Sequence, residues 1–174
     1  MRHMSVILVS SLLTSLACAA TAQEDGAVSN GQQFGEWTVS CEAIAVNRTA
    51  CVLTQALLRD TDQAFIAQML AFWSGDGTQS YVAARVPVGA YLPAGFAMRS
   101  ETSEEVIQFT WQTCTQQFCE AMAALGAEKI TELATGEAQI VASYRPGLAV
   151  DPIVFSFSMA GAGAGLAALH PDKG

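Results

Sequence analysis

Short runs in which apolar and polar residues alternate with a period of two recur along most of this chain. The clearest examples are residues 50–58, 80–86, 105–111 and 153–159. Turn-forming residues separate the runs at intervals of about 8–12 residues, as in Ser-Gly-Asp-Gly at positions 74–77. Many short strands at this spacing predict a mainly all-β fold, either a sandwich or a barrel.

Weaker patterns complete the expected order of elements. Residues 127–135 place Ile130 and Leu133 at helical spacing and stop at Gly136, which predicts a short helix. The Gly- and Ala-rich residues 161–169 are expected to be either a second short helix or a mobile tail. Further strands are predicted at residues 34–41, 63–73, 96–99 and 138–144.

The N-terminal segment has the organisation of a cleaved signal peptide. A positively charged start precedes an apolar run over residues 5–16, and residues 20–22 supply the small side chains that a leader peptidase reads. We therefore expect cleavage before Gln23. The run is too short to span a bilayer comfortably, and no later stretch is apolar enough, so no transmembrane span is expected in the mature chain.

An alternative for this segment is a lipoprotein acylated on Cys18. Ser15 stands where such a signal has Leu or a similar residue, so cleavage before Gln23 is favoured over lipidation. The predicted organisation is a signal peptide over residues 1–22, a flexible N-terminal leader over 23–33 and one sandwich domain over 34–170.

Composition excludes two broad classes of protein. The 174 residues include 8 Lys and Arg against 16 Asp and Glu, for a net charge of -8, which disfavours a nucleic-acid partner. A hydrophobic fraction of 51% with 14% charged residues excludes a disordered chain. The acidic charge favours a basic partner surface over an anionic membrane.

Four cysteines remain after cleavage, and an even number in an exported chain indicates two disulfides. Three pairings exist, and the local one is favoured because each pair is close in sequence. The spacing does not match a zinc site or a Cys-x-x-Cys redox motif, and a catalytic thiol would have only His170 as its base. The four residues are Cys41, Cys51, Cys114 and Cys119.

No catalytic, cofactor-binding or metal-ligating constellation emerges from the sequence. Asp60 with Asp62, and Glu104 with Glu105, lie in polar connections without the spacing of a calcium loop. A Gly-x-Ser-x-Gly elbow is absent. The Gly-Ala repeat at 161–165 is followed by too few residues for a dinucleotide fold. No cofactor is expected.

The order of short motifs resembles one family. Phe34-Gly35-Glu36-Trp37, followed by Cys41, looks like the Phe-Gly-Asp-Trp-x-x-x-Cys opening of invasion-associated locus B proteins, with Glu36 in place of Asp. Further matches follow in the expected order: Cys51 with Gln55, residues 86–89 and 92–95, Cys114 with Cys119, Leu133 with Gly136, and the last strand with Gly161 and residues 167–168.

This resemblance implies an immunoglobulin-like β-sandwich exported by a Gram-negative bacterium to the periplasm or outer envelope. It implies structural roles for Phe34, Gly35, Glu36 and Trp37, with Trp37 as a core aromatic residue. A disulfide between Cys41 and Cys51 would tie neighbouring strands. The namesake is linked to host-cell invasion, so a host-interaction or virulence-related role is the finer expectation, and no catalytic residue is carried over.

Three functional hypotheses follow. The preferred one is an exported non-enzymatic protein that acts through contacts with an envelope or host protein. The alternative is a periplasmic small-molecule or lipid-binding sandwich, with Phe65, Phe72, Trp73 and Tyr81 as pocket residues, although core packing explains these side chains more simply. The third is an envelope hydrolase using the Asp and Glu pairs named above.

Overall fold

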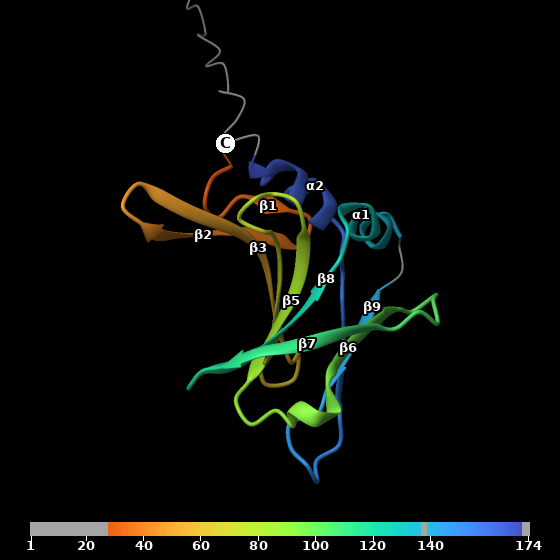
Figure 1. Ribbon diagram of the computed structural model, residues 1–174. Helices are drawn as coiled ribbons and strands as arrows, with labels where there is room; N and C mark the ends of the chain where they lie inside the picture. Colours follow the sequence, from red (N-terminus) through yellow and green to blue (C-terminus); the bar gives the residue numbers. More distant parts are fainter. Residues whose placement is uncertain (1–27, 137–138, 172–174) are drawn as a thin grey trace, which may run out of the picture.

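The computed structural model describes residues 28–136 and 139–171 (Figure 1). Within these ranges ten strands form one antiparallel sheet in the order β1-β2-β3-β4-β5-β8-β7-β6-β9-β10. The strands are β1 (Gln33–Phe34), β2 (Trp37–Ala45), β3 (Arg48–Leu58), β4 (Phe65–Trp73), β5 (Ser80–Pro87), β6 (Phe96–Ser100), β7 (Ile107–Cys114), β8 (Phe118–Ala124), β9 (Ile140–Tyr144) and β10 (Ile153–Phe157).

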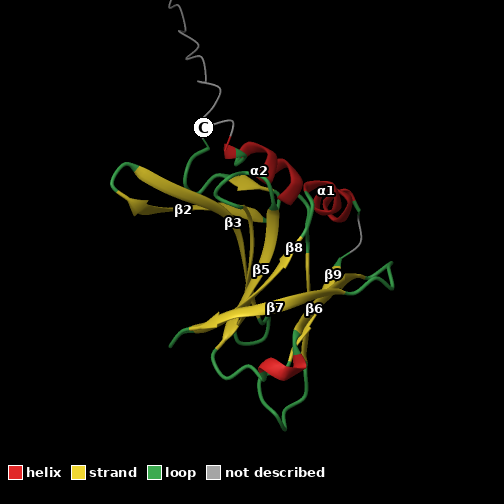
Figure 2. Cartoon of the chain, viewed as in Figure 1, coloured by secondary structure: helices red, strands yellow, loops and turns green. Residues whose placement is uncertain are grey.

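Strand β7 belongs to both layers of the fold. Its first residues, Ile107–Phe109, pair with β6, and its later residues from Thr110 onward pair with β8. The sheet therefore bends at β7, and β6, β9 and β10 face the layer formed by β2–β5 and β8 (Figure 2). The hydroxyl of Tyr144 on β9 donates to the carbonyl of Ile66 on β4 at 3.1 Å, which joins the two layers. Burial raises the pKa of this phenol.

One apolar core fills the space between the layers. Alternate residues of each strand point into it, as Val82, Ala84 and Val86 do on β5. Its largest side chains include Trp37 and Phe96, both fully buried. The prediction of a mainly all-β, disulfide-bridged sandwich with short helices is confirmed, because each period-two run supplies one face to this core.

The two helices cover one end of the sandwich. Helix α1 (Ala127–Thr135) has the predicted bounds and buries Ile130 and Leu133. The Gly-rich tail forms the second short helix, α2 (Ala162–Ala168), and not a mobile tail. This helix buries Leu166, and the Leu166 carbonyl accepts a 2.8 Å hydrogen bond from the Trp73 indole. Neither described helix has the length and apolar character required to cross a membrane.

The strand predicted over residues 34–41 is wrong in part, because a turn at Gly35 and Glu36 divides it into β1 and β2. Two further features were not predicted from the sequence. Strand β8 lies between β5 and β7, although its sequence, Phe-Cys-Glu-Ala-Met-Ala-Ala, is poor in β-branched residues. A short 3-10 helix, η1 (Leu92–Ala94), occupies the loop between β5 and β6. The small side chains of β8 suit a central strand, because Ala121 and Ala123 fit under the facing layer.

The predicted leader over residues 23–33 lies only partly within the described residues. Gly31 donates to the Val39 carbonyl, and the Val39 N–H donates to the Gln32 carbonyl, both at 2.8 Å. Contacts with β2 therefore begin before residue 34. The predicted cleavage site before Gln23 lies outside the described residues.

Candidate functional site

The Phe34-Gly35-Glu36-Trp37 motif forms the hairpin turn between β1 and β2, in which Phe34 pairs with Trp37. The indole N–H of Trp37 donates to the Ser158 carbonyl at 3.0 Å, so the buried ring holds the segment that follows β10. Glu36 is exposed at the turn. The motif thus joins the start of the domain to its end.

Two glycines allow this junction to close. Gly35 has a φ of +58°, and a Cβ added to it would lie 2.4 Å from the carbonyl oxygen of Ala160. Gly161 has a φ of +91°, and its Cβ would lie 2.1 Å from the carbonyl oxygen of Phe34. Both positions need the left-handed backbone and the absence of a side chain.

Cys41 and Cys51 form a disulfide between directly opposite positions of β2 and β3, with their Cα atoms 4.0 Å apart. Such close approach is typical of antiparallel pairs that do not exchange backbone hydrogen bonds. The bridge therefore fixes the register of this hairpin at the point where it leaves the core.

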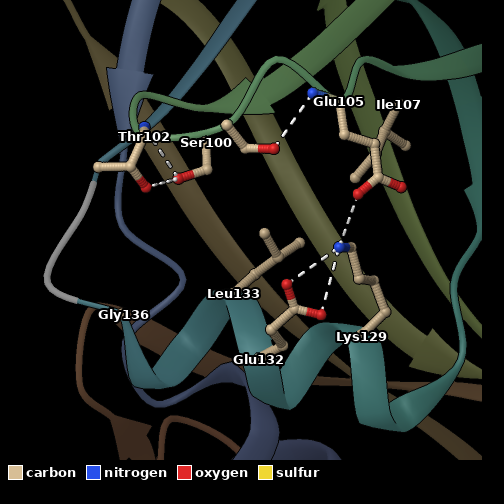
Figure 3. A pocket seen from close by; sticks show the side chains of 9 residues that line it. Ser100, Thr102, Glu105, Ile107, Lys129, Glu132, Leu133 and Gly136 are labelled. Carbon is tan, nitrogen blue, oxygen red and sulfur yellow. Dashed lines mark hydrogen bonds and ion pairs between the residues drawn. The ribbon is translucent and has the colours of Figure 1, made fainter.

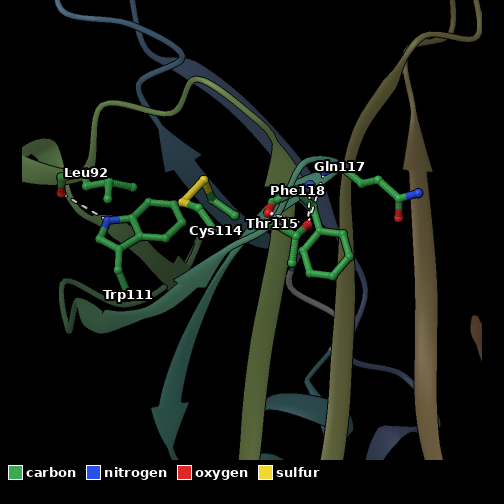
Figure 4. Close-up of a disulfide and its surroundings, with 7 residues drawn as sticks. Leu92, Trp111, Cys114, Thr115, Gln117 and Phe118 are labelled. Atoms are coloured by element: carbon green, nitrogen blue, oxygen red, sulfur yellow. Dashed lines mark hydrogen bonds between the residues drawn. A yellow bond between two sulfur atoms is a disulfide. The ribbon is translucent and has the colours of Figure 1, made fainter.

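Cys114 and Cys119 form the second disulfide, across the turn between β7 and β8 (Figure 4). The hydroxyl of Thr115 accepts hydrogen bonds from the Gln117 and Phe118 N–H groups within the same turn. All four cysteines of the described chain are thus in bridges. They are structural in this geometry, because neither pair presents a free thiolate.

The carboxylates considered for acid–base chemistry do not form a site. Asp60 and Asp62 lie in the turn between β3 and β4, where Asp62 pairs with Arg59 at 3.4 Å. Glu104 and Glu105 lie in the loop between β6 and β7. Within residues 28–136 and 139–171, no group of three or more His, Cys, Asp and Glu side chains could hold a metal ion.

Glu105 instead belongs to a small polar crevice between that loop and α1 (Figure 3). The ammonium group of Lys129 lies 2.9 Å from Glu105 and 3.1 Å from Glu132. The hydrogen bonds that the Lys129 ammonium group donates to the Glu105 and Glu132 carboxylates raise the pKa of Lys129. The crevice encloses about 130 Å³. Because Lys129 lies on α1 and Glu105 in the loop, their ion pair ties the loop to the helix, while Glu132 holds the cation from within the helix.

The side of β2–β5 and β8 that points away from the core, here called the outer face, has a different character. Phe72 on β4 and Tyr81 on β5 stack on it with ring centroids 5.7 Å apart. Leu70 and Ala83 form its floor and are 3% and 0% exposed. Further large apolar side chains that point to this side include Ile44, Val52, Phe118 and Met122.

Charge is sparse on the outer face. Glu42, Arg85 and Glu120 are its charged side chains over positions 38–44, 50–56, 66–72, 81–87 and 118–124. Arg85 donates to Glu120 at 2.7 Å and lies 4.7 Å from the centre of the Phe118 ring, so its charge is compensated. Glu42 has no salt-bridge partner among the described residues. An apolar face with so few charges resembles the core of a protein interface.

The outer face is also hollowed. A groove of about 380 Å³ runs across β2, β3 and β4, and its charged lining residues are Glu42, Arg85 and Glu120. Its apolar floor includes Val52, Leu70 and Phe72, and its polar walls include Ser40, Thr54 and Gln68. The groove can therefore hold apolar side chains of a bound molecule and offer hydrogen bonds beside them.

The four aromatic residues of the alternative hypothesis do not line one pocket. Phe72 and Tyr81 lie on the outer face, whereas Trp73 points inward and packs edge-on against His170, with ring centroids 4.6 Å apart. Phe65 is exposed at the start of β4. Trp73 borders a separate hollow of about 430 Å³ between the β2–β3 hairpin and the end of α2.

Comparison with known proteins decides the family. The sequence model of the invasion associated locus B (IalB) protein family matches residues 37–170, from β2 to beyond α2. The chain belongs to the invasion associated locus B family. Two invasion protein B homologs of Brucella abortus, from strain 2308 and from biovar 1 strain 9-941, are each 26% identical over 155 residues, covering 88% of this chain and 87% of theirs.

A solved member of the family has the same fold. The crystal structure of invasion associated protein B from Bartonella henselae matches with a TM-score of 0.62 at 16% identity, covering 81% of this chain and 95% of that one. The invasion associated locus B family is not known as an enzyme family. Membership of this family and the two disulfides support export of the chain.

Proposed function

We propose that this invasion associated locus B protein is a non-enzymatic protein of the periplasm or outer envelope that works by binding another protein. The outer face is the surface proposed for that contact. The observation that carries the proposal is the grooved surface across β2–β5 and β8, where aromatic and aliphatic side chains lie beside only three charged ones, in a chain with a net charge of -8.

The rigidity of this surface supports a binding role. Its strands are paired on both sides, from β3 to β5, and the Cys41–Cys51 bridge fixes the hairpin at one side. A preformed surface loses little conformational entropy when a partner binds, so more of the contact energy appears as affinity. The stacked pair of Phe72 and Tyr81 offers the kind of aromatic anchor that dominates interface energies.

Cross-linking in intact cells tests the proposal with two matched variants. Phe72→Asp places a charge in the groove, and Val154→Asp places the same charge on β10, where Val154 is 64% exposed. We expect a cross-linked complex of the wild-type protein that persists in Val154→Asp and falls at least tenfold in Phe72→Asp. Equal yields from both variants, or no complex of the wild type, would contradict the proposal.

A small-molecule or lipid-binding role is the second candidate. The hollow beside Trp73 and Leu169 favours it, because about 430 Å³ is within the size range of small-ligand sites. Native mass spectrometry of protein isolated from the periplasm without reductant tests this candidate. A discrete additional mass that leaves on activation would support it, and a chain that begins at Gln23, lacks four hydrogens and carries nothing else would oppose it.

A further inference from the structure

The hairpin of β2 and β3 extends beyond the sandwich past its disulfide. Residues 42–50, here called the hairpin tip, are exposed at every position, and Figure 1 shows the hairpin reaching away from the layers. Val46 at its end is 90% exposed and Ile44 is 57% exposed. The tip thus presents apolar side chains on a segment held at its base by Cys41–Cys51.

The backbone of β2 is paired on both edges only as far as Cys41. One edge is occupied by β3 along its length. On the other edge, Val39 exchanges hydrogen bonds with Gly31 and Gln32, and the Cys41 N–H donates to the side-chain oxygen of Asn30 at 2.9 Å. The hydrogen bond from Cys41 to the Asn30 side chain is the last contact between residues 30–32 and this edge of β2.

The described chain turns away from the edge at that point. Gln32 donates to the Ser29 carbonyl at 3.1 Å in a tight turn, and Val28 lies in the hollow beneath the hairpin beside Leu169. Because hydrogen-bonding groups repeat every two residues along a strand, the Cys41 carbonyl and both backbone groups of Ala43 point the same way as those of Val39. No described backbone group pairs with them on that side.

We propose that this edge of β2, which the described residues leave unpaired at Cys41 and Ala43, accepts an extended strand of the partner protein. The proposal rests on the proposed function and names how the partner binds. The added strand would place alternate apolar side chains beside Ile44 and the groove of the outer face, which Ile44 also lines. A Lys or Arg of the strand would meet the carboxylate of Glu42, which forms no salt bridge within residues 28–136 and 139–171.

Charge favours a different protein over a second copy of this chain. Pairing two copies through this edge would bring together two Glu42 carboxylates and two chains that each carry a net charge of -8. A partner strand with basic and apolar residues has neither cost. Within the described residues, the exposed edge also lacks the Lys and Pro residues that commonly protect such edges against strand addition.

Ala43→Pro is the most selective test, because it removes the N–H that points away from β3 and leaves the hydrogen bonds between β2 and β3 in place. Ala43→Thr keeps the N–H and is the matched control. A photo-cross-linking amino acid in place of Val46 reports the partner in intact cells, and a second one in place of Phe72 reports the outer face. Thermal unfolding with the disulfides intact checks that the variants fold.

We expect Ala43→Pro to lower the cross-link from position 46 at least tenfold, and Ala43→Thr to change it less than twofold. If the proline variant does not fold, replacement of Ala43 by the corresponding hydroxy acid deletes the N–H without a ring and is expected to give the same loss.

Folded variants without the N–H that keep the full cross-link from position 46 would overturn strand addition. So would a cross-linked species with twice the mass of the chain, which would assign the edge to a second copy. If the cross-link from position 72 persists while position 46 gives none, strand addition fails and the proposed function stands. If neither position gives a cross-link, both fail.

Discussion

Single residues at the closure of the domain have consequences that local sequence does not reveal. The glycine of the Phe-Gly-Glu-Trp motif is needed because its backbone touches residue 160, which is far away in the sequence. Gly35→Ala would place a Cβ 2.4 Å from the Ala160 carbonyl oxygen at a φ of +58°. Gly75 lies in an exposed turn, where an added Cβ meets nothing within 4 Å.

We expect Gly35→Ala to lower the free energy of unfolding by about 2 kcal/mol or more, because it combines backbone strain with a clash. Gly75→Ala should change it by less than about 0.5 kcal/mol. Urea unfolding of the two variants measures the difference. Equal effects would mean that the junction with Gly161 does not constrain the fold.

Asp76 gives a pH-dependent prediction at the same scale. Hydrogen bonds from the Ser74 hydroxyl and from the Thr78 N–H and hydroxyl lower its pKa from 3.8 to about 2. A carboxylate with a lowered pKa in the folded state stabilises the fold above its unfolded pKa, and this contribution is lost as the pH falls through about 2.

Asp76→Ala should therefore unfold at a lower temperature than the wild type at pH 7. The gap between their melting temperatures should narrow from pH 4 to pH 2. Melting curves at several pH values measure it. A gap that stays constant down to pH 2 would show that the ionised carboxylate does not stabilise the turn.

At the scale of elements, the two disulfides constrain hairpins of different length. Cys41 and Cys51 are separated by 10 positions, and Cys114 and Cys119 by 5. Because a longer loop loses more entropy when it is closed, removing the first bridge should destabilise the fold by about 0.6 kcal/mol more than removing the second. Guanidinium unfolding of the variants C41A/C51A and C114A/C119A measures both losses, and the reverse order would contradict this account.

The elements that could be predicted from sequence are those whose pattern reflects one buried face. The run over residues 80–86 alternates because Val82, Ala84 and Val86 enter the core, and it became β5 with little change of bounds. Strand β8 was missed because Ala and Met at its positions carry no strand preference, and its place between β5 and β7 determines its conformation. The extended conformation of β8 therefore depends on its pairing with β5 and β7 and not on the strand preference of its own residues.

At the scale of the whole molecule, the candidate surface depends on register, which one sequence does not contain. Phe72 and Trp73 are neighbours in the chain, but they lie on opposite sides of β4, so they cannot line one pocket. The sequence predicted the pairing of the cysteines, because the two members of each pair are close in sequence. It also singled out the Phe-Gly-Glu-Trp motif, because the spacing from this motif to Cys41 is recognisable. It did not reveal the outer face, since five strands contribute to it and one of them is β8.

A photo-cross-linking footprint around the molecule in intact cells tests whether the outer face binds a partner protein. A cross-linking amino acid replaces, one at a time, Val52, Phe72 and Tyr81 on the outer face, and Val106, Leu148 and Val154 elsewhere on the surface. We expect one common partner protein to be captured from the three outer-face positions, and little or none of it from the other three. Capture of that partner mainly from positions 106, 148 and 154, or equally from all six, would contradict this expectation.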